Sequence, residues 1–243
     1  MILIAGDSWS VGEWSHSSNI HNGFGQYLHD NGHFVCNLGV GGGWNGLSVS
    51  RLDSFLNSNT YNIDQISHIF VFQTEWIRDV LSSQYPYSNL FVEQDFDYDY
   101  QTLKNRVLSR FYHSLSNIAT QVNKTIFIIG GASDTSWLDK FSTEYPNLEI
   151  VCQSFTNLLV NNNHRINDPV YSLYSRDHDR FVNKLKELYI DKDFRFVLDD
   201  MDLASKRIKI FNSNKEFFWP DFRHPNRKAH KILFDFINKN YIV

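Results

Sequence analysis

The sequence lacks several features that would assign it to a broad class at once. Its 243 residues include only two cysteines, and no apolar run approaches the roughly 20 residues that a membrane-spanning helix needs. No linker rich in Pro, Gly or Ser and no long run of charge divides the chain, so we expect one domain over residues 1–243. The 42% hydrophobic and 21% charged content is typical of an ordinary soluble globular protein.

An excess of basic residues is also absent. The 23 Lys and Arg are outnumbered by 27 Asp and Glu, which leaves a formal net charge of -4. Nucleic acid is therefore not an expected partner, since the phosphate backbone is bound through Lys and Arg. The first residues, Met1 to Ala5, show no signal-peptide pattern. This favours a cytoplasmic protein or a virion component, with no membrane partner.

Residues that often form cross-links or metal sites are not arranged for either role. Cys36 and Cys152 are far apart and lie in apolar, strand-like stretches, which predicts two buried free thiols, with a disulfide between them as the alternative. Four histidines fall within the first 33 residues, but their spacing matches no metal motif. We expect no metal site.

Apolar runs of strand length alternate with helix-like segments along the chain. This pattern predicts an α/β fold in which helices cover both faces of a parallel sheet. The expected strands are Ile2–Ala5, Phe34–Leu38, His68–Phe72, Thr125–Ile129 and Leu148–Cys152, with a weaker one at Phe194–Leu198. The expected helices are Gly25–Asp30, Leu47–Leu56, Tyr100–Val122, Asp177–Leu188 and Asn226–Lys239. Residues 76–98 and 153–176 show neither period, which makes them candidate lids or binding loops.

A serine follows the first apolar strand in the segment Ile4-Ala5-Gly6-Asp7-Ser8-Trp9-Ser10. In an open α/β sheet, functional sites form at the carboxyl ends of strands. Gly6 permits a sharp turn there, and Ser8 offers a hydroxyl nucleophile together with its own N–H for an oxyanion. The same residues are also typical of an ordinary turn.

A second motif, Asp221-Phe222-Arg223-His224-Pro225-Asn226, precedes the last expected helix. A carboxylate three residues before an imidazole can hydrogen-bond to it, fix its tautomer and stabilise its cation. The alternative is an aspartate that caps a turn beside an exposed histidine.

Together these two motifs resemble the SGNH/GDSL hydrolase family. The family's first block is Gly-Asp-Ser-x-Ser near the N-terminus, and its last is Asp-x-x-His-Pro-Asn before the final helix. The resemblance implies a three-layer, flavodoxin-like α/β/α fold and no cofactor. It also implies that Ser8 is the nucleophile, that His224 is the general base and that Asp221 orients His224.

Two further family blocks supply the oxyanion hole. Asn37-Leu38-Gly39-Val40-Gly41-Gly42-Gly43 resembles the second block, and Gly42 aligns best with the glycine whose N–H binds the oxyanion. The third block, Gly-x-Asn-Asp in the family, is replaced by Gln73-Thr74-Glu75-Trp76. Glu75 thus stands where an asparagine is expected. The Gln73 amide could replace that donor, or Glu75 could be held away by pairing with Arg78.

Four tryptophans adjoin these blocks, namely Trp9, Trp44, Trp76 and Trp219. They could line one cleft, where flat aromatic faces suit sugar rings or acyl chains. Ordinary core packing is the alternative.

We therefore expect a serine esterase that removes an O-acetyl group from a carbohydrate. One rival is an SGNH-fold binding or structural protein, for example one associated with a virion, that has lost turnover. The other is a thioesterase or lysophospholipase using the same triad. The sequence leaves the oligomeric state open.

Overall fold

Five parallel strands form the central sheet of the protein. The computed structural model describes residues 1–15, 18–58, 61–76, 78–79, 100–131, 135–165, 212–218 and 224–242. The sheet strands are β1 (Ile2–Ala5), β4 (Val35–Asn37), β5 (His68–Gln73), β6 (Ile126–Gly130) and β7 (Leu148–Cys152). They lie in the order β4-β1-β5-β6-β7, and every neighbouring pair is parallel. Numbered along the chain this order is 2-1-3-4-5, which is that of flavodoxin-like sheets.

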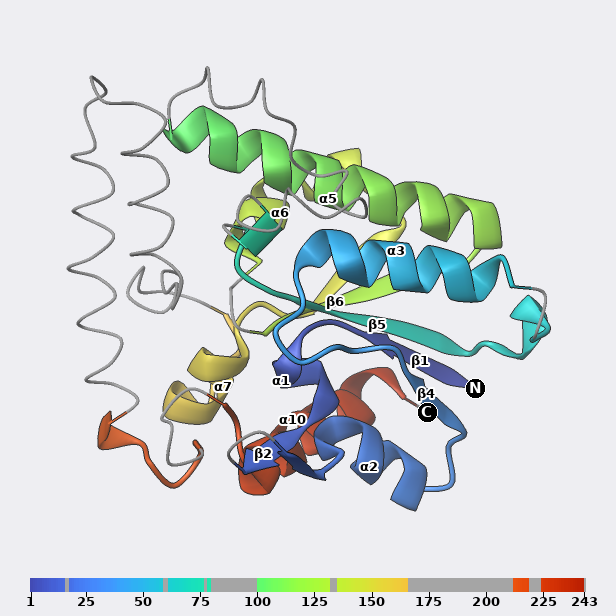
Figure 1. The fold of residues 1–243 in the computed structure, drawn as a ribbon. Coiled ribbons are helices and arrows are strands. Elements are labelled where there is room, and N and C mark those ends of the chain that lie inside the picture. Colours follow the sequence, from blue (N-terminus) through green and yellow to red (C-terminus); the bar gives the residue numbers. More distant parts are fainter. Residues whose placement is uncertain are drawn as a thin grey trace.

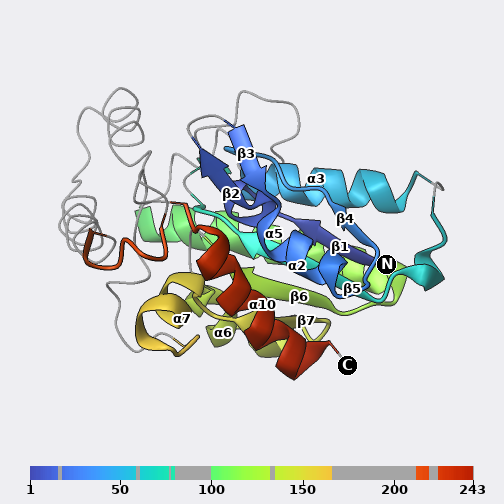
Figure 2. The ribbon, with the colours of Figure 1, turned by 90° about the horizontal axis from the view of Figure 1, so that it is seen from below.

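Helices cover both faces of this sheet. The described helices are α1 (Ser8–Val11), α2 (Gly23–Asp30), α3 (Asn45–Leu56), α5 (Tyr100–Val122), α6 (Ser136–Lys140), α7 (Phe155–Asn161) and α10 (Arg227–Tyr241). Two short 3₁₀ turns are η1 (Ile63–Gln65) and η3 (Ser142–Glu144). Figure 1 shows α3 and α5 on one face of the sheet and α2 and α10 on the other. The view from below in Figure 2 shows α10 lying across β6 and β7. The predicted α/β fold is confirmed.

Side-chain alternation along the strands explains these layers. In β1, Leu3 and Ala5 pack into the cluster under α3 and α5, whereas Ile2 and Ile4 pack into the cluster under α2 and α10. All four are at most 1% exposed, as expected for a strand buried on both faces. On α5 the buried residues recur every three or four positions, so one stripe faces the sheet. Its members are Leu103, Val107, Leu108, Phe111, Tyr112, Leu115, Ile118, Ala119 and Val122.

A small antiparallel hairpin lies outside the main sheet. It comprises β2 (Glu13–Ser15) and β3 (Ser18–His21) and follows α1 directly. The Arg227 Nε of α10 donates to Glu13 Oε2 at 2.7 Å, although the two residues are 214 positions apart. The hairpin is thereby tied to the helix that begins beside His224.

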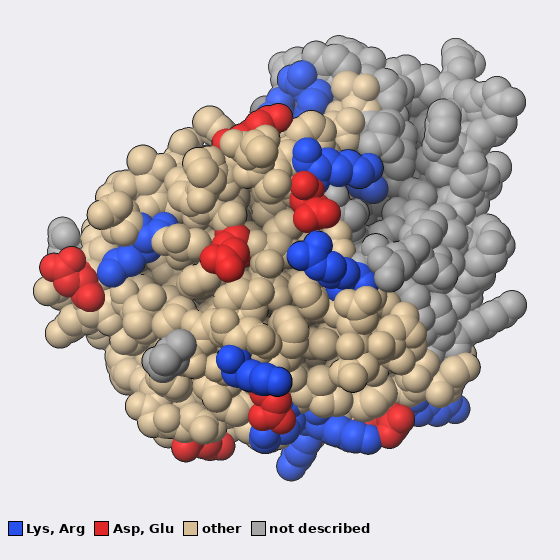
Figure 3. Space-filling view, turned by 180° about the vertical axis from the view of Figure 1, so that it is seen from behind, with Lys and Arg blue, Asp and Glu red and all other residues tan. Residues whose placement is uncertain are grey.

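Charges of both signs are interspersed on one face of the described part of the molecule. Figure 3 shows a face on which Lys and Arg alternate with Asp and Glu, so neither sign forms a continuous field there. Within the described part of the chain, no helix combines the length and apolarity needed to cross a bilayer.

Most predicted elements are present with boundaries shifted by one or two residues, but two expectations were wrong. Residues 155–161 were expected to be part of a loop and instead form α7, because the Ser154 hydroxyl accepts a hydrogen bond from Asn157 N–H and caps the helix. Cys36 is only half-buried because β4 is an edge strand, while Cys152 is buried as expected. The predicted segments Asp177–Leu188 and Phe194–Leu198 lie outside the described residues.

The turn after β1 depends on a glycine. Gly6 has a φ of +149°, and a Cβ at this position would lie 2.7 Å from Phe72 Cβ and 2.9 Å from Ser10 Cβ. Both the backbone conformation and the packing therefore exclude a side chain. This contact lets the chain pass from β1 into α1 directly against β5.

We expect Gly6→Ala to lower the free energy of unfolding by about 2–3 kcal/mol, because strain and steric overlap add. Gly32→Ala is the matched control, since Gly32 also has a positive φ, +87°, but a Cβ added there would meet nothing within 4 Å. That variant should lose only about 1 kcal/mol, from strain alone. Urea unfolding measures both values, and equal losses would contradict the packing argument.

Candidate active site

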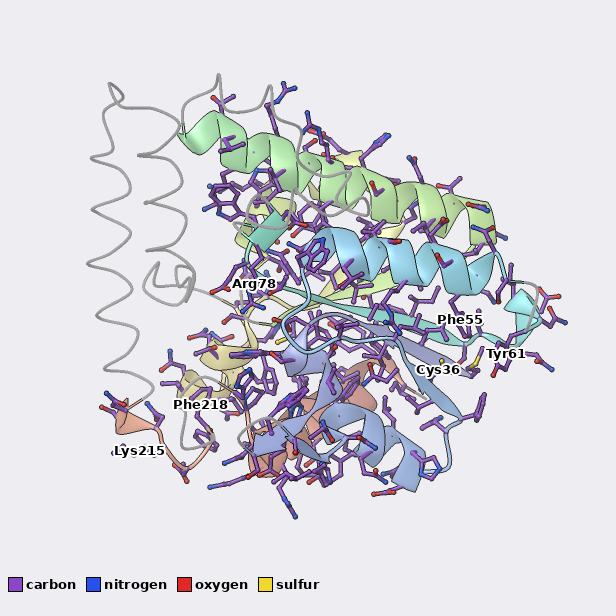
Figure 4. All side chains as sticks on the ribbon, viewed as in Figure 1. Cys36, Phe55, Tyr61, Arg78, Lys215 and Phe218 are labelled. Atoms are coloured by element: carbon purple, nitrogen blue, oxygen red, sulfur yellow. The ribbon has the colours of Figure 1, made fainter. Side chains whose placement is uncertain are left out.

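The strand order places the candidate site. Strand β1 lies between β4 and β5, so the chain leaves β1 in one direction across the sheet and later returns on its other side. Ligands bind at this switch point, outside the carboxyl ends of the two strands. The carboxyl end of β1 leads into Ser8, and that of β5 leads into Thr74 and Glu75. Figure 4 shows Arg78 at this end of the sheet and Cys36 toward the opposite end.

Ser8 is the first residue of α1 and is 5% exposed. Asp7 precedes it as the N-cap, and its Oδ1 accepts a hydrogen bond from Trp9 N–H at 3.0 Å. As the first residue of the helix, Ser8 has no intrahelical acceptor for its own N–H. The local structure thus presents the hydroxyl and the N–H of one residue at the end of β1.

His224 lies against Ser8, with its Nε2 2.9 Å from Ser8 Oγ. Two features hold this segment in place. Asn226 caps α10 by accepting a hydrogen bond from Ala229 N–H, and Pro225 forms an isolated antiparallel bridge with Phe218. A residue near the C-terminus is therefore brought to the nucleophile turn 216 positions away. Asp221 lies outside the described residues, so its predicted role stays a prediction.

The glycine loop offers a second N–H group. Gly42 is exposed and has a φ of +74°, and within the described ranges no residue accepts a hydrogen bond from its amide. The loop is attached to the nucleophile turn, since Val40 N–H donates to Gly6 C=O at 3.0 Å. The loop that carries Gly42 therefore lies beside the turn that carries Ser8, and the role of Gly42 as an oxyanion donor stays a prediction.

Of the two alternatives considered for Glu75, the structure contains the ion pair with Arg78. Arg78 Nε donates to Glu75 Oε2 at 2.8 Å, and the glutamate is only 4% exposed. Gln73 points instead toward α5, where the Tyr112 hydroxyl donates to its Oε1. The Oε1 atom of Gln73 is thus engaged beneath a helix, and Glu75 is charge-paired, while the donor role predicted for the Gln73 amide stays a prediction.

A buried carboxylate, that of Asp7, lies at the centre of the site. Asp7 is fully buried, and its Oδ2 accepts hydrogen bonds from Thr74 Oγ1 at 2.8 Å and from Arg78 Nη1 at 3.1 Å. Its Oδ1 caps α1, as described above. One side chain therefore joins the turn after β1 to the turn after β5.

A second buried group holds the start of α3. Asn45 exchanges two hydrogen bonds with the backbone of Thr74, accepting from its N–H at 2.9 Å and donating to its C=O at 3.1 Å. Asp79 accepts from Gly46 N–H at 2.7 Å and from Asn45 Nδ2 at 3.0 Å. Burial raises the pKa of Asp79 to about 7, against the opposing effect of these hydrogen bonds. Helix α3 is thereby fixed to the end of β5.

Of the four tryptophans expected to line the cleft, two lie in the core instead. Trp9 is 4% exposed and packs edge-on against Phe155 at 5.8 Å, because the first turn of α1 directs it under α7. Trp76 is 7% exposed and belongs to the cluster under α3 and α5. Trp44 is half-buried at the N-cap of α3, and Trp219 lies outside the described residues.

A different tryptophan, Trp14 of β2, contacts the site. Its Nε1 donates to Ser8 C=O at 3.0 Å, and its ring centroid lies 6.4 Å from that of His224. A Cβ on Gly41 would lie 2.7 Å from the Trp14 ring, so the indole also packs on the glycine loop. Sequence reasoning missed Trp14 because no spacing rule predicts a hairpin that folds back over its own preceding helix.

Comparison with known proteins returned structural similarity only. No family model matches the chain, and no curated protein matches it in sequence. Similar solved structures include the psychrotrophic esterase EstA from Pseudoalteromonas sp., inhibited by monoethylphosphonate, at 15% identity over 98% of this chain and 94% of that one, with a TM-score of 0.43. TesA is similar at 13% identity over 97% and 94%, with a TM-score of 0.41. By its own strand order and site, the chain is a flavodoxin-like α/β protein with a serine–histidine pair at the switch point.

A buried histidine on α10 affects stability rather than the site chemistry. His230 is fully buried beside Phe155, and burial lowers its pKa to about 3. Below the ordinary pKa of 6.5, His230 binds a proton in the unfolded chain but not in the folded protein. The free energy of unfolding therefore decreases as pH falls from 6.5 toward 3. Asp79 has the opposite effect. Because its pKa is raised in the folded protein, the free energy of unfolding decreases as pH rises from about 4 to 7.

We expect His230→Leu to remove a slope of about 1.4 kcal/mol per pH unit between pH 4 and 6. The variant should then lose less stability on acidification than the wild type, by up to roughly 3 kcal/mol at pH 4. Urea unfolding across this pH range measures the difference, with His29→Leu on the exposed side of α2 as control. Parallel pH curves for wild type and His230→Leu would contradict the assignment.

Proposed function

We propose that this protein is a serine hydrolase of the SGNH type that cleaves carboxylic esters, most specifically O-acetyl groups on carbohydrates. The observation that carries the proposal is the 2.9 Å contact between Ser8 Oγ and His224 Nε2 at the sheet's switch point. A nucleophile within hydrogen-bond reach of a base is the arrangement that covalent catalysis requires. The match of both segments to the family's first and last blocks supports the same interpretation.

The reaction proceeds in two steps. Ser8 Oγ attacks the ester carbonyl while His224 Nε2 accepts the serine proton, and the tetrahedral oxyanion collapses when His224 passes that proton to the leaving alcohol. Water then attacks the acyl-serine, giving up a proton to His224, and release of the carboxylic acid returns the proton to Ser8. Asp221 orients His224 in this scheme.

The N–H groups of Ser8 and Gly42 bind the oxyanion in both steps. Glu75, which replaces the family asparagine, supplies no donor, since a carboxylate only accepts hydrogen bonds. Its pairing with Arg78 reduces the repulsion that a developing oxyanion would otherwise meet. The site thus relies on two backbone amides, and loss of a third donor costs about a hundredfold to a thousandfold in rate.

The proposed carbohydrate specificity is supported by Trp14. Its half-buried ring lies beside His224 and against the glycine loop, where a substrate's alcohol portion would lie. An indole face suits the apolar face of a sugar ring. The core positions of Trp9 and Trp76 leave Trp14 and Trp44 as the described tryptophans with exposed surface near the family blocks.

A fluorophosphonate probe distinguishes an enzyme from an inactive binding protein. We expect the wild type to be labelled stoichiometrically and Ser8→Ala and His224→Ala to be labelled at least a hundredfold more slowly, because the nucleophile or its base is missing. Ser50→Ala on α3 and His29→Ala on α2 are matched controls that should react like the wild type. A folded wild type that stays unlabelled would contradict the catalytic proposal.

The acyl and sugar preferences are tested by comparing acetate release from acetylated sugars with hydrolysis of longer acyl esters. We expect the sugar acetates to be better substrates. Trp14→Ala should raise KM for them roughly tenfold, the loss of one stacking contact, while Trp14→Phe keeps most of the affinity. A preference for long acyl chains would favour the thioesterase or lysophospholipase alternative.

A further inference from the structure

The side chain of Arg78 contacts all three segments that form the proposed oxyanion site. Its Nη1 donates to Asp7 Oδ2 at 3.1 Å and to Gly43 C=O at 3.3 Å, and its Nε donates to Glu75 Oε2 at 2.8 Å. Asp7 adjoins the nucleophile, and Gly43 adjoins the glycine that offers the second N–H. Figure 4 shows Arg78 where the end of β5 approaches α1 and the start of α3.

The turn after β5 aims this side chain. Arg78 N–H donates to Glu75 C=O at 3.0 Å, which closes a tight turn and brings the guanidinium back over Glu75. The side chain is 15% exposed, compared with 0% for Asp7 and 4% for Glu75. Arg78 is therefore packed among its partners, and such buried charge-assisted contacts resist displacement more than surface ion pairs do.

The charges in this cluster require a cation. Asp7 and Glu75 place two buried carboxylates beside the position where an oxyanion would develop, and the Arg78 guanidinium lies between them. Without it, the two carboxylates would repel each other and the oxyanion. A lysine could supply the charge but not the fork of donors that reaches two directions at once.

We propose that Arg78 is a positioning residue that sets the spacing of the Ser8 and Gly42 amides and neutralises Glu75 beside the oxyanion. This inference rests on the proposed function. It explains how a glutamate can replace the family asparagine, because the ion pair with Arg78 neutralises that carboxylate and holds it in place. Displacement of an oxyanion donor by about 1 Å can cost a hundredfold in rate, so the effect should appear in kcat rather than in KM.

The test compares fluorophosphonate labelling rates and steady-state ester hydrolysis for the wild type, Arg78→Met, Arg78→Lys and Arg78→Met with Glu75→Gln. We expect Arg78→Met to lower the labelling rate and kcat about a hundredfold with little change in KM. Arg78→Lys should lose about tenfold, and Glu75→Gln should restore at least tenfold to the Met variant because it removes the uncompensated charge. Arg51→Met, at an exposed position on α3, is the control and should match the wild type.

Each outcome separates the inference from the function on which it rests. An unlabelled wild type overturns both. A labelled wild type with an equally reactive, folded Arg78→Met protein overturns the inference alone. If Arg78→Met lowers the labelling rate and kcat but adding Glu75→Gln does not restore them, the charge-neutralising role is overturned. If the Met variant does not fold by near-ultraviolet circular dichroism, the Lys variant decides, and a wild-type rate in that variant contradicts the proposal.

Discussion

The buried carboxylate of Asp7 is the constraint on which the site depends. It caps α1, accepts the Thr74 hydroxyl and pairs with Arg78, all without exposure to water. Removal of one partner from a buried ion pair typically destabilises a protein by about 3–5 kcal/mol, because the remaining charge is left uncompensated. The residue that precedes the serine therefore stabilises the turn as well as orienting it. Ser8 is held in position because its neighbour cannot move without losing these contacts.

Sheet topology explains how distant segments reach this carboxylate. The turns after β1 and β5 lie at adjacent strand ends, and the glycine loop after β4 joins them through Gly6. The N-cap of α10 then brings His224 to the same edge, and the β2–β3 hairpin adds Trp14 from the side. Five separate parts of the chain converge, although no single helix or strand contains more than one of the proposed reacting groups. The site is therefore formed mainly by the turns and loops that connect the strands and helices.

The sequence predicted the sheet and the serine–histidine pair better than it predicted the surroundings. Strands such as β1 and β7 are recognisable because both of their faces are buried, so their residues form short, continuous apolar runs. The proximity of Ser8 and His224 was inferred from a family resemblance, since no local pattern relates residues 216 positions apart. Trp9 was misjudged because its place beside the nucleophile in sequence does not reveal that the helical turn directs it inward. The role of Trp14 depends on a hairpin contact, and tertiary contacts of this kind have no periodicity to detect.

Glu75 likewise combines a feature that the sequence shows with contacts that only the structure shows. Its departure from the family pattern was visible in the sequence, and so was a possible partner three residues later. What only the structure shows is that Arg78 also reaches Asp7 and Gly43, so that the ion pair belongs to a network rather than to one turn. A substitution that looks unfavourable for chemistry is thus accommodated by Arg78, which also contacts the Asp7 carboxylate and the Gly43 carbonyl.

The most direct measurement is a crystal structure of the protein after reaction with a small phosphonate ester. We expect a phosphorus–Ser8 Oγ bond, with the phosphonyl oxygen about 2.7–3.1 Å from the N–H groups of both Ser8 and Gly42. Glu75 should remain paired with Arg78. An adduct on another residue, or a phosphonyl oxygen that points into solvent away from both amides, would contradict the proposed nucleophile and oxyanion site.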